Sequence, residues 1–207
     1  MTWGDSFVSF DTETTGLGND ARIIELAFVR FEKGEIAERW ESFFKPEGVN
    51  WDDPNVQKAL EVNQIQRSAL DNAPSFMDVF HHIAAHLRGV DVWVAHNAEF
   101  DLRMLDQEHK AHKGTTFPIQ PKLCLCTKLL SSRIHPQEKK HNLNVVAPRW
   151  GVQQDGAHRA ASDAITCGRI LHAMHAKNAL PSERSEVEEF HKQASADWNS
   201  RNGGRRR

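Results

Sequence analysis

The sequence predicts an α/β fold in which helices pack around one mixed β-sheet. Two observations predict this class. The N-terminal part contains three strand-like runs in succession, whereas the remainder alternates between apolar segments of helical spacing and short apolar strands. The length of 207 residues suits one domain with a substantial core and a short appendage. We therefore expect a domain at residues 1–180 and an extension at residues 181–207.

The first three strands are expected near the N-terminus. Ser6–Asp11 contains a short apolar run, and Ile23–Glu32 is rich in Ile, Val and Phe. Lys33-Gly34 forms a plausible hairpin turn into a third strand, Glu35–Phe44. Pro46–Asn55 is predicted to be a loop, because it combines Pro, Gly, Asn and two Asp.

Helices and strands are expected to alternate after that loop. Ser75 is a suitable N-cap for a helix over Phe76–Leu87, whose apolar residues keep helical spacing. Val90–Ala95 is a short apolar strand that leads directly into a helix at "HNAEFDLRML". The remaining expected elements are a strand at Lys122–Cys126 and helices at Leu143–Trp150 and Ala160–Lys177.

The C-terminal extension is polar and highly charged. From about Ser182 it predicts a short helix followed by a disordered basic tail, "RNGGRRR". The three arginines either add nonspecific attraction to a polyanion or form an inert tail.

Composition favours a cytoplasmic protein that does not enter a membrane. Unbroken apolar runs are only a few residues long, far short of the roughly 20 that span a bilayer. Asp5 and Asp11 lie where a signal peptide would need basic and apolar residues. Three cysteines, an odd number, favour reduced thiols in an intracellular protein. The net charge of −2 means that binding to nucleic acid would require a local basic patch or bound metal ions.

Acidic residues recur where predicted strands end or helices begin. Asp11 and Glu13 close the first strand and project from the same face, because side chains alternate along a strand. Asp101 falls in the first turn of the helix after Ala95, and Asp163 lies in the last long helix. Each has an ordinary explanation as a solvated pair, as helix electrostatics or as a solvent-facing residue. Their conjunction, in this order, favours a cation site.

The motifs together resemble those of the DEDDh family of 3′–5′ exonucleases. The family's D-x-E motif corresponds to "FDTETTGL", its H-N-x-x-F-D motif to "HNAEFD" and its H-x-A-x-x-D motif to "HRAASD". These segments span Phe7 to about Leu171. The resemblance implies a ribonuclease H-like fold, with a five-stranded mixed sheet and the acidic cluster at its mouth. Residues 1–180 would form the exonuclease domain.

The resemblance also implies a two-metal site. Oxygen-only ligands select hard ions such as Mg²⁺ or Mn²⁺. Asp11 would bridge two such ions, Glu13 and Asp163 would help to hold the first, and Asp101 would serve the second through water. His158 would be the general base, since its ordinary pKa suits proton removal near neutral pH. The alternative for His158 is a surface residue, as for most of the twelve histidines.

Contacts to the substrate are expected around these motifs. Thr14, Thr15 and Gly16 would offer N–H groups and hydroxyls to the terminal sugar. By resemblance, Leu17 would wedge against the last bases and Phe100 would pack beside them. Phe100 could equally belong to the helix core, and Asn97 is either a substrate contact or a helix cap. A basic loop would hold substrate phosphates or be merely solvated; its residues are Arg133, His135, Lys139, Lys140 and His141.

The resulting prediction is a metal-dependent 3′–5′ exonuclease that releases nucleoside 5′-monophosphates. Its partner would be a nucleic acid with a free 3′ end, DNA in preference to RNA and single strands in preference to duplex. A DNA polymerase or a second copy of the chain is a further candidate partner. The alternatives are an exoribonuclease of the same family, a noncatalytic polymerase-associated nucleic-acid-binding subunit, and a metallophosphoesterase for small nucleotides.

Overall fold

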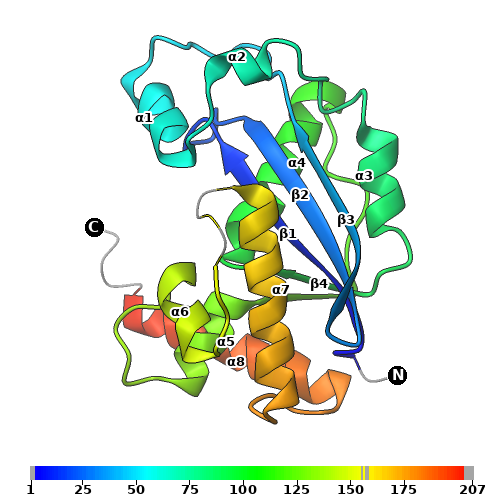
Figure 1. Ribbon diagram of the computed structural model, residues 1–207, viewed down its shortest axis with the longest axis vertical. Coiled ribbons are helices and arrows are strands. Elements are labelled where there is room, and N and C mark those ends of the chain that lie inside the picture. Colours follow the sequence, from blue (N-terminus) through cyan, green and yellow to red (C-terminus); the bar gives the residue numbers. More distant parts are fainter. Residues whose placement is uncertain (1–2, 155, 157–158, 203–207) are drawn as a thin grey trace.

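The computed structural model describes residues 3–154, 156 and 159–202, and its strands form one sheet in the order β3-β2-β1-β4-β5 (Figure 1). The strands are β1 (Ser6–Thr14), β2 (Ile23–Glu32), β3 (Glu35–Phe43), β4 (Val92–Ala95) and β5 (Leu123–Cys126). Neighbours β1, β2 and β3 pair antiparallel, whereas β4 runs parallel to both β1 and β5. The predicted α/β class with a five-stranded mixed sheet is confirmed.

The central strand β1 contributes to the cores on both faces of the sheet, because its side chains alternate. Phe7 belongs to one apolar cluster, whereas Val8 and Phe10 belong to the other. All three are fully or almost fully buried, as expected for a strand with a neighbour on each side. The strand therefore ends between two packed layers, and its last residues can meet groups from either layer.

Helices cover both faces of the sheet (Figure 1). Helix α7 (Ala160–Ala176) packs on the Phe7 face together with α5 (Thr127–Ile134) and α6 (Leu143–Arg149). Helices α3 (Phe80–Leu87) and α4 (Ala98–Lys113) pack on the opposite face. Gly168 allows α7 to approach β2 closely, because a Cβ at that position would overlap the Phe31 ring.

Three helices and one helix boundary differ from the sequence prediction. Helices α1 (Pro54–Asn63) and α2 (Arg67–Leu70) follow the predicted loop, and α5 follows β5 directly. The N-cap of α1 is Asp53, whose carboxylate accepts from the Asn55 N–H at 2.7 Å. Helix α3 begins at Phe80, so the predicted N-cap role of Ser75 is wrong. Ser75 and Asp78 instead exchange hydrogen bonds of 2.9 and 3.3 Å within a preceding turn.

The C-terminal extension contains α8 (Arg184–Asn202), a helix of 19 residues rather than a short one. Val187 and Ala194 are buried beneath it, and Arg133 of α5 pairs with Asp197. These contacts make α8 part of the packed structure. Of the predicted tail "RNGGRRR", Arg201 and Asn202 belong to α8, and residues 203–207 lie outside the described residues.

None of the described helices combines the length and the hydrophobicity that a bilayer span requires. Cys124, Cys126 and Cys167 are free thiols.

Candidate active site

The carboxyl end of β1 brings Asp11 and Glu13 to the face covered by α7. They follow Ser9 at two-residue intervals, and the Ser9 hydroxyl donates to the Ala164 carbonyl of α7 at 2.7 Å. This buried bond ties β1 to α7 next to Asp163. The register of β1 against β2 also shifts immediately after Glu13, which changes the direction of the strand there.

Three carboxylates meet at this point. One oxygen from each of Asp11, Glu13 and Asp163 lies within 4.8 Å of the other two. Glu13 is buried, whereas Asp11 and Asp163 are partly exposed. Hard divalent cations prefer carboxylate oxygens, so this donor set fits such an ion.

Asp101 approaches the cluster from α4, on the other side of β1. Its Oδ1 accepts from the Thr12 N–H at 3.0 Å and from the Thr12 hydroxyl at 2.7 Å. Because Thr12 lies between Asp11 and Glu13 in the strand, these two bonds fix a fourth carboxylate beside the other three. Asp101 is only 3% exposed, so its charge is strongly felt by its neighbours.

The pKa values reflect this concentration of charge. Burial and then the charges of Asp101 and Glu13 raise the pKa of Asp11 well above its usual range. Burial, followed by repulsion from Asp163, raises the pKa of Glu13 to about 8. Burial also raises the pKa of Asp101 to about 7, although the Thr12 hydrogen bonds oppose the shift. Protons or cations are therefore needed to neutralise the cluster near neutral pH.

Sequence reasoning missed the ion pair that holds the start of α7. Glu25 of β2 stands opposite Glu13 and is 1% exposed. It accepts from the Arg159 guanidinium at 2.8 and 3.1 Å and from the Ala160 N–H at 3.1 Å. The signal was a single charged residue inside the apolar run "IIELAF", which indicates a buried partner.

Two polar residues that sequence reasoning also missed orient the carboxylates. The Gln154 side-chain amide donates to Asp163 Oδ1 at 2.7 Å, as Thr12 donates to Asp101. Such partners fix the direction of a ligand's lone pairs. The signal for Thr12 was its position inside the D-x-E motif, whereas Gln154 had no sequence signal.

His158, the predicted general base, lies outside the described residues. Its role therefore stays a prediction from the H-x-A-x-x-D motif.

The residues after Glu13 are largely engaged within the protein. The Thr14 hydroxyl donates to the Gly16 carbonyl at 2.7 Å. Thr15 is buried, its N–H donates to the Arg22 carbonyl and its hydroxyl accepts from the Arg22 N–H, each at 2.9 Å. The Thr15 N–H, which was predicted to contact the sugar, is therefore already used within the protein. Leu17, in contrast, is 80% exposed, and Gly16 has room for a Cβ, with Ala21 Cβ 4.0 Å away.

Phe100 and Asn97 lie at the amino end of α4. Phe100 is partly buried against the core, and the Arg103 guanidinium lies 5.1 Å from its ring centroid. Asn97 occupies the N-cap position with a left-handed backbone, but its side chain does not cap the helix. Its amide oxygen instead accepts from Lys128 Nζ at 3.2 Å. Asn97 is therefore the N-cap of α4 by position, as one of its two predicted roles, without a side-chain capping bond.

The predicted basic loop is only partly a loop and only partly exposed. Arg133 belongs to α5 and pairs with Asp197. His141 is buried, with its ring nitrogens bonded to the Ser131 hydroxyl at 3.0 Å and the Glu138 carbonyl at 3.1 Å. These two residues are not available to phosphates, which corrects the prediction. The exposed members of the group are Lys139 and Lys140, whereas His135 is partly buried.

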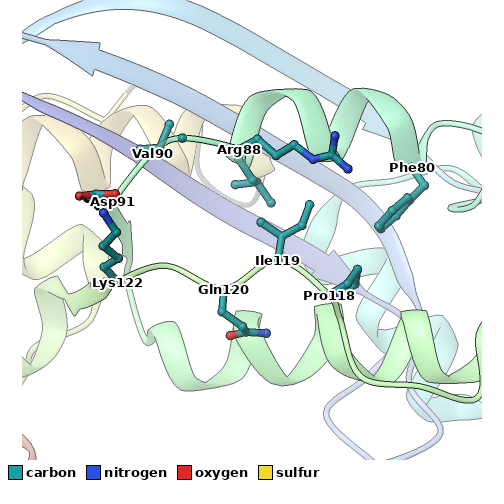
Figure 2. A pocket seen from close by; sticks show the side chains of 10 residues that line it. Phe80, Arg88, Val90, Asp91, Pro118, Ile119, Gln120 and Lys122 are labelled. Atoms are coloured by element: carbon teal, nitrogen blue, oxygen red, sulfur yellow. Dashed lines mark hydrogen bonds and ion pairs between the residues drawn. The ribbon is translucent and has the colours of Figure 1, made fainter.

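A cavity of about 490 Å³ lies elsewhere on the molecule (Figure 2). It is lined by Phe80, Arg88, Asp91, Ile119 and Lys122, among others, and adjoins the amino end of β4. Because β4 runs parallel to β1, this is the opposite end of the strands from the carboxylates. The carboxylate cluster and this cavity are therefore separate features.

The fold and the gathered carboxylates together define a ribonuclease H-like nuclease. More particularly, the chain belongs to the exonuclease family, because the ribonuclease T-type exonuclease model of that family matches residues 8–171. The resemblance found in the sequence is thereby confirmed.

Relatives and solved structures agree with this membership. DNA polymerase III subunit epsilon of Treponema pallidum is 32% identical over 177 residues, covering 84% of this chain and 78% of that protein. The PolC-type DNA polymerase III of Oceanobacillus iheyensis is 34% identical over 170 residues, covering 81% of this chain. The chain spans only 11% of that polymerase. Exonuclease X in complex with 5′ overhanging duplex DNA has the same fold, with a TM-score of 0.65 at 24% identity, covering 89% of this chain and 99% of that one.

Proposed function

We propose that this chain is a 3′–5′ exonuclease that removes nucleoside 5′-monophosphates from the 3′ end of DNA, preferably single-stranded. The observation that carries the proposal is the convergence of Asp11, Glu13 and Asp163 oxygens within 4.8 Å. Carboxylates at such distances repel one another, which makes the cluster unfavourable unless cations neutralise it. An exonuclease needs such cations at the scissile phosphate.

The carboxylates would hold two Mg²⁺ or Mn²⁺ ions, with Asp11 shared between them. Glu13 and Asp163 would complete the first site, and Asp101 would serve the second. Such ions activate a water nucleophile and stabilise the leaving oxygen of a phosphodiester. The contribution of the protein is to hold the carboxylates close together and correctly oriented through Thr12 and Gln154.

The roles of the other residues are proposed from their motifs. His158 would accept the proton of the attacking water. Leu17 is exposed next to β1 and would pack against the terminal bases. Phe100 would pack beside the same bases. Such contacts do not depend on base identity, which suits a nuclease that degrades any sequence.

The activity is tested with 5′-labelled single-stranded DNA, duplex DNA and RNA in Mg²⁺. We expect a ladder that shortens from the 3′ end, fastest on single-stranded DNA, and no products with EDTA or with Asp11→Ala. Internal cleavage, or activity that persists in EDTA, would contradict the proposal. Faster digestion of RNA would favour the exoribonuclease, and binding without digestion would favour a noncatalytic subunit.

The general base is tested with His158→Ala. Turnover should fall by roughly 10²-fold, because a positioned base contributes about that factor. Binding of Mg²⁺ and DNA, measured by calorimetry and fluorescence anisotropy, should be retained. His82→Ala, at an exposed position of α3, is the matched control and should keep full turnover. Undiminished turnover of His158→Ala would eliminate this assignment.

A DNA polymerase is the proposed protein partner. The relatives named as DNA polymerase III subunit epsilon and PolC support this, since the former is a subunit and the latter contains the matching segment within a longer chain. Co-purification with a replicative polymerase from a cell extract, compared with a tag-only control, tests the partnership. Recovery of the chain without a polymerase would count against it.

A further inference from the structure

Helix α8 brings an aromatic side chain to the neighbourhood of the candidate active site. The family match ends at residue 171, so α8 lies outside it. Trp198 of α8 is partly exposed, and Lys128 Nζ lies 5.0 Å from its ring centroid. The same ammonium group donates to Asn97 Oδ1 at 3.2 Å. Asn97, Lys128 and Trp198 therefore form a continuous set across α4, α5 and α8, which we call the α8 platform.

The platform adjoins the carboxylate cluster. Asn97 immediately precedes α4, and Asp101 lies four residues later, one turn further along that helix. Asn97 is exposed and Lys128 is partly exposed, so both can be reached from solvent. A strand whose 3′ end occupies the cluster would pass close to this surface.

The positive charge of Lys128 remains available to a phosphate. Its two contacts are a neutral amide oxygen and an aromatic ring, neither of which neutralises it. Nearby arginines differ, because Arg133 pairs with Asp197 and Arg149 pairs with Glu138. No salt bridge within the described part of the chain includes Lys128.

The Trp198 ring is held in place. Its edge meets the His141 ring, with centroids 6.1 Å apart and planes at 82°. Helix α8 is itself anchored on β5 and α5, since the Cys126 N–H of β5 donates to His191 Nε2 at 3.1 Å and Arg201 donates to the Ser132 carbonyl of α5 at 3.4 Å. A rigid aromatic ring loses little entropy when a base stacks on it, which makes it an effective nucleic-acid contact.

We propose that the α8 platform is a binding site for the single-stranded part of a nucleic acid, upstream of the nucleotide being removed. Lys128 contacts a backbone phosphate, and Trp198 packs against a base or sugar. This inference rests on the proposed exonuclease function. It adds a site that the carboxylate motifs do not contain and gives α8 a role in substrate binding.

The site is tested by comparing a dinucleotide with a single-stranded oligonucleotide of about eight residues. Trp198→Ala should raise the KM for the oligonucleotide about tenfold, since base–aromatic stacking is worth about 1–3 kcal/mol. Its kcat, and hydrolysis of the dinucleotide, should stay unchanged, because the dinucleotide does not reach the platform. Trp198→Phe should restore most of the affinity, because it retains an aromatic face.

Lys128→Gln provides an independent variant and readout. The slope of log KM against log salt for the oligonucleotide should decrease by about 0.7, the value for one contact to a single-stranded phosphate. Loss of packing alone would not change this slope.

Phe190→Ala is the matched control, because Phe190 belongs to α8 and also packs against a cation, Arg133, at 5.0 Å. It should lower the melting temperature without raising the KM for the oligonucleotide. If Phe190→Ala and Trp198→Ala raised the KM equally, the cause would be impaired packing of α8 on the domain. That result would overturn the inference. If the wild-type protein is active and Trp198→Ala leaves the KM for the oligonucleotide unchanged, the α8 platform is overturned while the proposed exonuclease function stands. Wild-type protein that digests neither substrate would overturn the proposed function and the platform with it.

Discussion

Thr12 stands between two carboxylates of β1 and is hydrogen-bonded to a third. Its N–H and its hydroxyl both donate to Asp101 Oδ1, at 3.0 and 2.7 Å. Hydrogen bonds to a carboxylate favour its charged form, so Thr12 lowers the pKa of Asp101 against the effect of burial. A charged Asp101 is the form that would bind a cation. Thr12 thus links the geometry of the site to its protonation.

Thr12→Val keeps the shape of the side chain and removes only the hydroxyl donor. We expect the Mg²⁺ concentration for half-maximal activity to rise about tenfold, because loss of a group that orients a metal ligand typically weakens metal binding by that order. Metal titrations of the nuclease activity measure the change. Thr115→Val, at an exposed threonine on another part of the surface, should behave as wild type. If Thr12→Val and Thr115→Val gave identical titration curves, the Thr12 hydroxyl would have no role in metal binding.

The loop at residues 15–22, which carries the exposed Leu17, is held against α4 by side chains of that helix. Arg103 donates to the Leu17 carbonyl at 3.2 Å while its guanidinium lies over the Phe100 ring. Gln107 donates to the Ala21 carbonyl at 2.5 Å. One element therefore positions both side chains that are proposed to contact the terminal bases. The loop and the helix act as one unit.

Arg103→Ala should loosen this unit. We expect kcat/KM on single-stranded DNA to fall about tenfold, because misplacing substrate contacts reduces productive alignment. The melting temperature should change little, since the Arg103 bonds to the loop lie at the exposed surface. Arg39→Ala on β3, which removes an exposed arginine paired with Glu41, is the control. Equal activities of the two variants would show that the loop keeps its place without Arg103.

The negative charge at the carboxyl end of β1 is a property of the whole molecule, since β1, α4 and α7 each contribute to it. In the metal-free protein this charge opposes folding. The pKa values of Glu13 and Asp101 are raised to about 8 and about 7, so between about pH 5 and pH 8 the folded state binds more protons than the unfolded state. Stability should then fall as the pH rises through this window.

Thermal unfolding followed by circular dichroism checks this expectation. In EDTA the melting temperature should decrease between about pH 5 and about pH 8, and saturating Mg²⁺ should raise it most at the upper end of that range. Glu13→Gln should flatten the dependence on pH and reduce the response to Mg²⁺. A melting temperature that rises with pH in EDTA would contradict the raised pKa values.

Local pattern was sufficient for most of the sheet. The second strand was predicted with the bounds that the structure has, because β-branched and aromatic residues favour a strand through local preferences. Helix boundaries were less predictable. Ser75 and Asp78 satisfy each other in a turn, and only the packing of Phe80 and Ile83 on the sheet decides where α3 begins.

The sequence by itself determined the fold class, the family and the four motif carboxylates, because these depend on spacing along the chain. Only the tertiary structure decided that Asp163 reaches Asp11 and Glu13, that Thr12 holds Asp101, and that Glu25 binds Arg159. The burial of His141 and the contact between Trp198 and Lys128 also depend on the tertiary structure. The physical reason is that these contacts join residues far apart in sequence, and the packing of helices on a twisted sheet sets their distances.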